Sequence, residues 1–309
     1  MNEKFLTKTP VVWLGALICC GLWGSAFPCI KLGYQFMNIS NTDTACQILY
    51  AGCRFTLAGI FAIIIGSIAQ KKIIYPHANA IPKIIWLSLL QTVFQYLFFY
   101  IGLAHTTGVK ASIVDSLNVF IAIIIAGYMF RQEKVTLQKI IGCVIGFVGV
   151  VLVNITGTGL DASFTFTGEG FIFLSTVAYA FSSVFLKKYS KTENPVMLSG
   201  YQFVLGGIIM IVCGAALGGR FDTISTNGIA MLIWLATISA VAYSLWGILL
   251  KYNPVSKVTI FGFMTPVFGV SLSAILLNES DTLGVKCVIA LILVCIGILT
   301  VNSRVDNRL

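Results

Sequence analysis

The chain has 309 residues, of which 58% are hydrophobic and only 10% are charged, and its mean hydropathy is +0.94. These values exclude a soluble globular protein, in which about a quarter of the residues are charged. The net charge of +9 could indicate a nucleic-acid partner, but the basic residues follow the loops between apolar runs. We therefore expect a lipid bilayer, and no nucleic acid, as the partner.

Apolar runs long enough to cross a bilayer recur along the whole chain. They fall near residues 11–32, 44–69, 83–104, 109–130, 137–155, 169–187, 196–217, 228–250, 257–277 and 283–302. The runs are continuous, whereas the strands of a membrane barrel would alternate. The first run is too long for the core of a signal peptide. The sequence thus predicts an all-α polytopic membrane protein with ten transmembrane helices.

The distribution of lysine and arginine predicts the topology. With the amino terminus assigned to the cytoplasm, fifteen of the 20 basic residues fall on the inner side. Four fall on the outer side, namely Lys31, Lys110, Arg220 and Lys286, and Arg54 lies inside a span. Basic residues are enriched in cytoplasmic loops. We expect a multi-pass protein of the plasma (inner) membrane with both termini cytoplasmic.

Two sequence patterns indicate an internal duplication. The segment Arg54-Phe55-Thr56-Leu57-Ala58-Gly59 resembles Gln202-Phe203-Val204-Leu205-Gly206-Gly207, and Glu133 with Thr136 recurs as Glu279 with Thr282. An odd number of helices per copy inverts the second copy, and inverted repeats in secondary transporters enclose the substrate site. The predicted parts are a first five-helix repeat at residues 1–155, a linker at 156–168 and a second five-helix repeat at 169–309.

Two charged residues lie deep inside predicted spans. Arg54 stands about ten residues into its apolar run, and Asp115 is a carboxylate away from both ends of its span, one turn before Asn118. A charge at such depth costs a few kcal/mol at least. Arg54 and Asp115 could satisfy each other as a structural ion pair between helices two and four. Alternatively, either residue could face a watery cavity and bind the ligand.

Further polar and aromatic residues are candidates for a substrate site. The amides of Gln91, Gln95 and Gln202 must find partners within the bilayer, either on neighbouring helices or on a ligand. Four aromatic residues could line a pocket or pack against neighbouring helices. They are Trp23, Tyr179, Tyr243 and Trp246.

Pro28 and Pro266 lie inside predicted helices, where proline removes a backbone hydrogen bond, so we expect hinges or gates there. Gly142, Gly146 and Gly149 form a small-residue face suited to tight helix packing or to contact within a homodimer. The nine cysteines lack metal-ligand spacing, and no phosphate-binding glycine loop occurs. We expect no metal and no cofactor.

The second half resembles a known family. The segments Tyr243 to Trp246, Pro254 to Lys257, Phe261 to Gly269 and Leu277 to Glu279 are similar to the second repeat of EamA-type members of the drug/metabolite transporter superfamily. Arg54-Phe55 followed by Ala58, and Glu133 followed by Thr136, resemble the corresponding parts of the first repeat. The resemblance implies two inverted five-helix repeats around a central cavity, and export of amino acids or other metabolites. The proline often found in helix four of the family is absent at residues 118–120, so the sequence does not predict whether that helix bends as it does in relatives.

We expect a secondary transporter that exports small metabolites such as amino acids by alternating access around a midplane cavity. Arg54 would attract a carboxylate, and Asp115 would pair with an amine or carry a coupling proton. The alternatives are an exporter of multiple drugs or organic cations, and a facilitative, channel-like uniporter. A membrane-embedded enzyme is disfavoured, because the sequence has only His77 and His105 and no carboxylate cluster.

Overall fold

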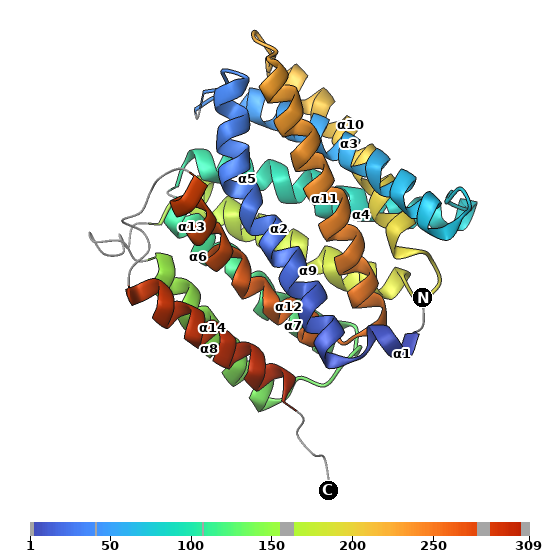
Figure 1. Cartoon of the computed structure of the whole chain (residues 1–309), viewed down its shortest axis with the longest axis vertical. Helices are drawn as coiled ribbons and strands as arrows, with labels where there is room; N and C mark the ends of the chain where they lie inside the picture. The colour runs from blue at the N-terminus through green and yellow to red at the C-terminus, as the bar shows by residue number, and fades with distance from the viewer. Residues whose placement is uncertain (1–2, 41, 107, 155–163, 277–284, 304–309) are drawn as a thin grey trace, which may run out of the picture.

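The computed structural model describes residues 3–40, 42–106, 108–154, 164–276 and 285–303, and these residues form helices and loops without a strand. Figure 1 shows the helices gathered into one bundle. Residues 156–163 of the predicted linker, and the repeat pair Glu279 and Thr282, lie outside the described residues.

Six helical stretches among the described residues are long and apolar enough to cross a membrane. They are α2 (Thr9–Phe36); α3 (Thr44–Gln70); the run of η1 (Ala78–Ala80), α4 (Ile81–Leu87), η2 (Ser88–Phe94) and α5 (Gln95–Ala104); the run of η4 (Phe166–Gly170) and α9 (Phe171–Tyr189); α10 (Pro195–Ala216); and α11 (Thr226–Tyr252).

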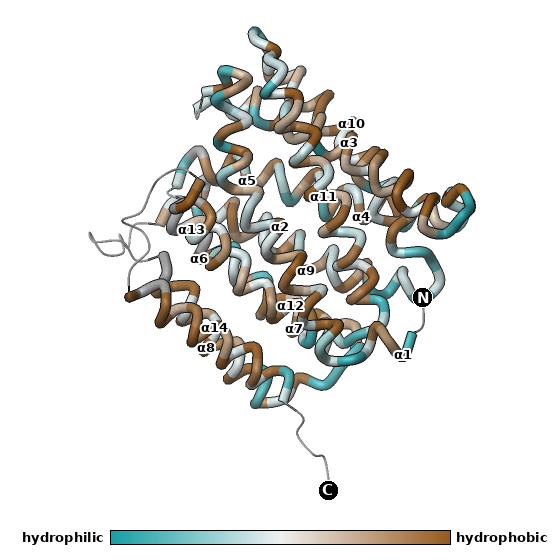
Figure 2. Tube along the Cα trace, in the orientation of Figure 1, coloured by the Kyte–Doolittle hydropathy of each residue, from teal (hydrophilic) through white to brown (hydrophobic). Residues whose placement is uncertain are grey.

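The remaining helices are shorter. They are α1 (Glu3–Leu6); α6 (Gly108–Ser116), α7 (Asn118–Ile124) and η3 (Ile125–Met129); α8 (Leu137–Asn154); α12 (Val255–Thr259), η5 (Ile260–Phe263) and α13 (Met264–Leu276); and α14 (Val285–Asn302). Hydrophilic residues gather at helix ends and loops, and hydrophobic residues predominate along the helices (Figure 2). The prediction of an all-α polytopic membrane protein is confirmed. The number of ten spans and the inverted repeat stay predictions.

Several helices begin at residues that satisfy their first backbone N–H groups. Asp43 accepts a hydrogen bond from the backbone of Cys46 at 2.9 Å, and Ser225 accepts one from Gly228 at 3.0 Å. Asn194 caps α10, which then begins with Pro195. Such caps fix where a helix starts, and proline suits the first turn because its missing donor would be unpaired there.

The main helix contacts join the first part of the chain to the second. Helix α3 packs on α10, α2 on α11 and α13, α9 on α5 and α7, and α8 on α14. Glycine makes the closest contacts possible: a Cβ atom on Gly59 would lie 2.5 Å from the Gly200 carbonyl oxygen. Such backbone approach is common between membrane helices.

The small-residue face of α8 is occupied within the chain. A Cβ atom on Gly142 would lie 2.8 Å from the Gly297 carbonyl oxygen, and one on Gly149 would lie 2.8 Å from that of Ala290. Gly146 faces the ring of Phe263. Helices α8 and α14 lie side by side at one edge of the bundle (Figure 1). The packing alternative for this face is therefore realised, and the face is covered by α14.

Two apolar stretches are interrupted near their middle. Pro266 stands early in α13, and its ring opposes the carbonyl of Gly262 four residues before, within the 3₁₀ turn η5. The stretch of the first part breaks at Leu117 without a proline, and there the side chain of Asn118 donates to the Asp115 carbonyl at 2.7 Å. Helix four is therefore interrupted too. In contrast, α2 continues through Pro28.

Candidate functional site

The guanidinium of Arg54 is buried, with 4% of the residue exposed. Its Nε and Nη2 donate to the hydroxyl of Ser239 on α11, at 3.1 and 2.9 Å. Ser239 is fully buried. Among the described residues Arg54 and Asp115 form no ion pair, so the structural ion pair between helices two and four is not present in this conformation.

Aromatic rings lie beside the Arg54 charge. The guanidinium carbon is 5.2 Å from the centre of the Phe55 ring, which in turn lies 4.4 Å from the ring of Tyr96. Tyr50 lies one turn before Arg54 on α3, and its buried hydroxyl has no hydrogen-bond partner among the described residues. A buried cation without a counterion is costly, because neutral hydroxyls replace its hydration incompletely. The site is therefore electrostatically suited to an anionic group.

An aromatic cluster lies beside this charge and consists of Trp23, Phe55, Tyr96, Phe203, Tyr243 and Trp246, from five helices. The ring of Trp23 lies 5.0 Å from that of Tyr243 and 4.9 Å from that of Trp246. The hydroxyls of Tyr96 and Tyr243 are 2.9 Å apart. The indole nitrogens of both tryptophans are buried without a hydrogen-bond partner among the described residues. Such donors usually have partners when buried, so they are candidates for bonding a ligand.

The carboxylate of Asp115, on α6, lies near Thr176 of α9. Thr176 Oγ1 is 3.4 Å from Asp115 Oδ1, but the same hydroxyl donates at 2.8 Å to the Ile172 carbonyl. A hydroxyl has one proton, so Thr176 satisfies the carboxylate only weakly. Asp115 thus retains capacity for a donor or a cation.

The predicted amides occupy different situations. Gln202 Nε2 donates to Gln91 Oε1 at 3.1 Å, and Thr92 donates to Gln202 Oε1 at 2.8 Å, all of them buried. For Gln91 and Gln202 the alternative of interhelical bonding is therefore realised. The Oε1 of Gln95 has no partner among the described residues. The side-chain amide of Asn118 donates to the backbone carbonyl of Asp115.

The sequence analysis missed several members of this site. Ser239, Tyr50, Thr176, Phe55, Tyr96 and Phe203 contact or surround the predicted residues. Tyr50 could have been found from its spacing of four to Arg54, and Tyr96 from its position next to Gln95. No spacing pattern pointed to Ser239, which is 185 residues from Arg54 in the chain.

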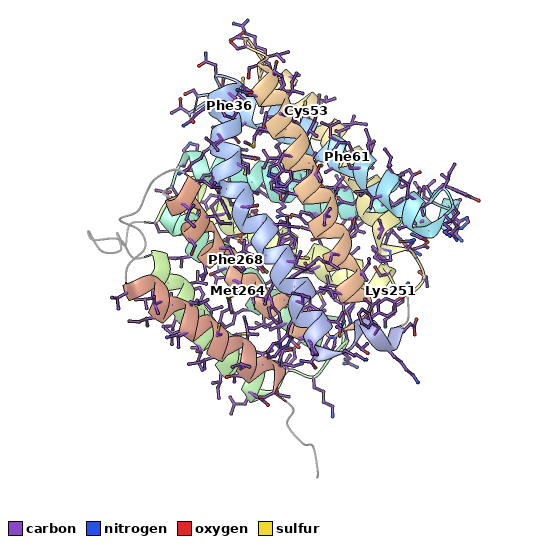
Figure 3. All side chains as sticks on the ribbon, in the orientation of Figure 1. Phe36, Cys53, Phe61, Lys251, Met264 and Phe268 are labelled. Carbon is purple, nitrogen blue, oxygen red and sulfur yellow. The ribbon has the colours of Figure 1, made fainter. Side chains whose placement is uncertain are left out.

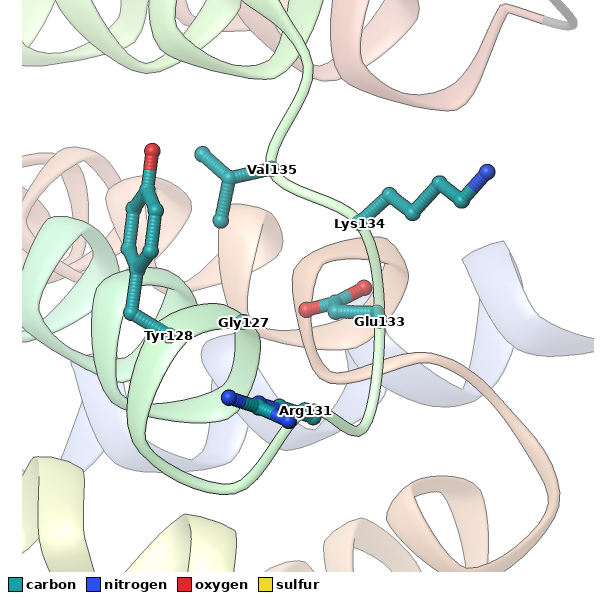
Figure 4. Close-up of a pocket in the computed structure, with 6 residues that line it drawn as sticks. All are labelled: Gly127, Tyr128, Arg131, Glu133, Lys134 and Val135. Atoms are coloured by element: carbon teal, nitrogen blue, oxygen red, sulfur yellow. The ribbon is translucent and has the colours of Figure 1, made fainter.

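Side chains fill the space between the helices (Figure 3). Two described cavities lie elsewhere: one of about 490 Å³ at the loop between η3 and α8 (Figure 4), and one of about 240 Å³ between apolar residues of α4 and α10. The aromatic cluster lines neither of them. Arg54, Tyr243 and Trp246 of the candidate site are buried.

Comparison with known proteins identifies the class. The model of the EamA-like transporter family matches residues 11–155 and 166–303. An uncharacterized transporter of Archaeoglobus fulgidus is 28% identical over 88% of this chain and 92% of its own length. The uncharacterized transporter YvbV of Bacillus subtilis is 23% identical over 98% of this chain and 96% of its own.

Two further similarities are more limited. A chloroplastic WAT1-related protein of Arabidopsis thaliana is 25% identical over 58% of this chain and 45% of its own length. A crystal structure shares the fold with a TM-score of 0.77 at 15% sequence identity, covering 94% of this chain and 96% of the other. The family match spans most of the sequence, and the relatives are named as transporters, not as enzymes. The chain belongs to the EamA-like transporter family.

Proposed function

We propose that this protein is a secondary transporter that exports small metabolites such as amino acids, by alternating access around a midplane site. The observation that carries the proposal is the Arg54 guanidinium, buried with only a neutral hydroxyl as its hydrogen-bond partner among the described residues. An anion of the substrate would supply the missing countercharge. A second charge within the helices, the weakly satisfied carboxylate of Asp115, lies on α6.

The two separated charges suit a zwitterion. A substrate carboxylate would bind Arg54 and accept from Tyr50, and a substrate amine would bind Asp115. Trp23, Tyr179, Tyr243 and Trp246 would pack against the substrate body, and their polar atoms, with Gln95 and Asn118, would orient it. Gln91 and Gln202 are bonded to each other, so they would reach a ligand only when α10 and η2 separate.

Helices of the first half of the chain pack on helices of the second half. This packing supports a mechanism in which the two halves move against each other. In this proposal residues 1–155 and 169–309 form inverted five-helix repeats joined by the linker 156–168, with ten spans in all. The interruptions at Leu117 and before Pro266 would absorb the motion, and Pro28 would allow α2 to bend. Both termini would face the cytoplasm of a plasma membrane, on the side of the basic loops.

An exporter of multiple drugs or organic cations is the second candidate. Asp115 favours it, because this carboxylate lacks a strong partner and because aromatic rings such as those of the cluster attract organic cations. In this case Arg54 would serve only to hold α3 against α11.

Counterflow in reconstituted vesicles tests the proposal. Vesicles loaded with single amino acids should accumulate the labelled form, and Arg54→Gln should reduce the rate at least tenfold, whereas Arg220→Gln should not, since Arg220 is paired at the surface and its side chain is 82% exposed. Asp115→Asn should weaken uptake of zwitterions more than that of plain carboxylates. Transport of organic cations that depends on Asp115 and not on Arg54 would support the second candidate. Flux without counterflow would indicate a channel-like uniporter.

A further inference from the structure

A basic cavity lies apart from the candidate transport site. It measures about 490 Å³ and is lined by Gly127, Tyr128, Arg131, Glu133, Lys134 and Val135 (Figure 4). Its walls are the end of η3 and the loop that leads to α8. This volume is within the range of pockets that hold small ligands or headgroups.

The residues around the cavity place it at the surface of the bilayer. Tyr128 and Met129 are 71% and 63% exposed at the end of an apolar stretch, and Leu137 is 72% exposed at the start of the next one. Exposed apolar residues at the ends of spans contact lipid, and tyrosine is enriched at the level of the headgroups. The cavity therefore opens where hydrocarbon meets water.

The charge of the cavity is positive. The carboxylate of Glu133 accepts from the backbone and hydroxyl of Ser256, at 2.9 and 2.6 Å, and from Lys139 Nζ at 2.9 Å. Arg131 and Lys134 are exposed and form no ion pair with a described residue. The one acidic group is thus already neutralised, and two cations remain.

The backbone of Arg131 takes the left-handed conformation that often ends a helix. Its φ angle is 49°. Backbone bonds on both sides fix the turn: Phe130 donates to the Ile125 carbonyl at 3.0 Å, and Gln132 to the Ala126 carbonyl at 2.7 Å. The Arg131 guanidinium extends on the side of Tyr128, whereas Lys134 extends its ammonium away from it (Figure 4).

We propose that this cavity binds the phosphate headgroup of an anionic phospholipid. Arg131 donates to the phosphate, Tyr128 packs on the glycerol region, and Lys134 adds attraction at longer range. Basic cavities between helices at the membrane surface bind acidic headgroups in this way. The proposal is independent of the transported substrate, because no residue of the cavity belongs to the candidate transport site.

The full-length protein in nanodiscs of phosphatidylcholine with increasing phosphatidylglycerol tests this proposal, with lipid retention measured by native mass spectrometry. Wild type should retain phosphatidylglycerol selectively. Arg131→Gln should weaken retention at least about tenfold, because the charge-assisted hydrogen bond to the phosphate is lost, and Lys134→Gln less. The double variant Lys71→Gln/Lys72→Gln is the matched control, since it removes two exposed cations of another loop and should retain the lipid as wild type does.

Two outcomes would overturn the proposal. If Lys71→Gln/Lys72→Gln lowers retention as much as Arg131→Gln, only the general surface charge attracts the lipid. If inorganic phosphate at millimolar concentration protects wild-type protein against thermal unfolding in detergent, and does so through Arg131, the cavity is a site for free anions. A circular-dichroism spectrum of each variant confirms that it is folded, so that lost retention reports on binding.

Discussion

At the scale of single residues, one hydroxyl accepts the hydrogen bonds of the Arg54 guanidinium. Ser239 accepts both of its described hydrogen bonds, and both residues are buried. In the hydrocarbon region a guanidinium has no water to replace a lost partner. The position of the charge is therefore set by a residue on α11, on the far side of the helix interface.

Ser239→Ala should destabilise the protein by about 2 kcal/mol, because two donors of a charged group lose their buried acceptor. The measurement is the free energy of unfolding in detergent by chemical denaturation. Ser244→Ala is the control on the same helix: the Ser244 hydroxyl has no partner among the described residues, and its removal should change stability by less than about 0.5 kcal/mol. Equal effects of the two variants would contradict the role of Ser239.

The sequence indicated the charges of the site better than their partners. Arg54 and Asp115 were identifiable because a charge within an apolar run requires a reason. Their hydroxyl partners were not, since Ser239 and Thr176 resemble many other hydroxyl residues in the spans, which often bond to their own helix. Trp23, Tyr243 and Trp246 do gather in one cluster, yet only their contacts separate them from other aromatic residues.

At the scale of helices, composition predicted the long apolar elements but not their interruptions. Pro266 marked the break before α13, because proline acts on the carbonyl four residues earlier. The break at Leu117 has no such marker: it depends on the local bond from the Asn118 side chain to the backbone of Asp115, which competes with the helical pattern. The glycine face of α8 was recognisable, but its partner α14 was not, since glycine spacing names no neighbour.

The interface of α3 and α10 should be sensitive to a single methyl group. In Gly59→Ala the new Cβ atom would lie 2.5 Å from the Gly200 carbonyl oxygen and 2.6 Å from the Val204 nitrogen. We therefore expect the free energy of unfolding to fall by about 1–3 kcal/mol. Gly21→Ala places its methyl group in open space and should be neutral or stabilising, because alanine favours the helix. Thermal midpoints by size-exclusion chromatography compare the two variants. A Gly59→Ala protein as stable as wild type would show that the helices are less tightly packed.

Glu133 connects the loop before α8 to the first turn of α12. Glu133→Ala removes the carboxylate that accepts from the Ser256 backbone and hydroxyl, and it leaves Lys139 without its ion pair. We therefore expect the free energy of unfolding to fall by about 3 kcal/mol. Glu193→Ala removes a pair with Lys83 that lies nearer the surface and should cost no more than about 1 kcal/mol. Denaturant unfolding in detergent measures both. A larger loss for Glu193→Ala would contradict the importance of the Glu133 contacts.

At the scale of the whole molecule, several bonds tie the two parts together at the end of the bundle that carries most basic loops. Glu133 accepts hydrogen bonds from Ser256, Lys83 pairs with Glu193, and the side-chain amide of Asn253 donates to the Leu6 carbonyl. Export by alternating access would require these bonds to break in each cycle.

A cross-link between the two parts should therefore stop transport. In a background with Cys53, Cys213, Cys287 and Cys295 replaced by serine, we expect a short bifunctional thiol reagent to join Glu133→Cys with Ser256→Cys, whose native side chains are in contact, and to abolish counterflow until the link is reduced. The pair Glu133→Cys with Lys139→Cys lies within the first part, and its native side chains are also in contact. Cross-linking this control pair should leave at least half of the counterflow, because it ties no moving parts together. If both links inhibit alike, the loop itself must move, and if neither inhibits, the two parts do not separate at this end during transport.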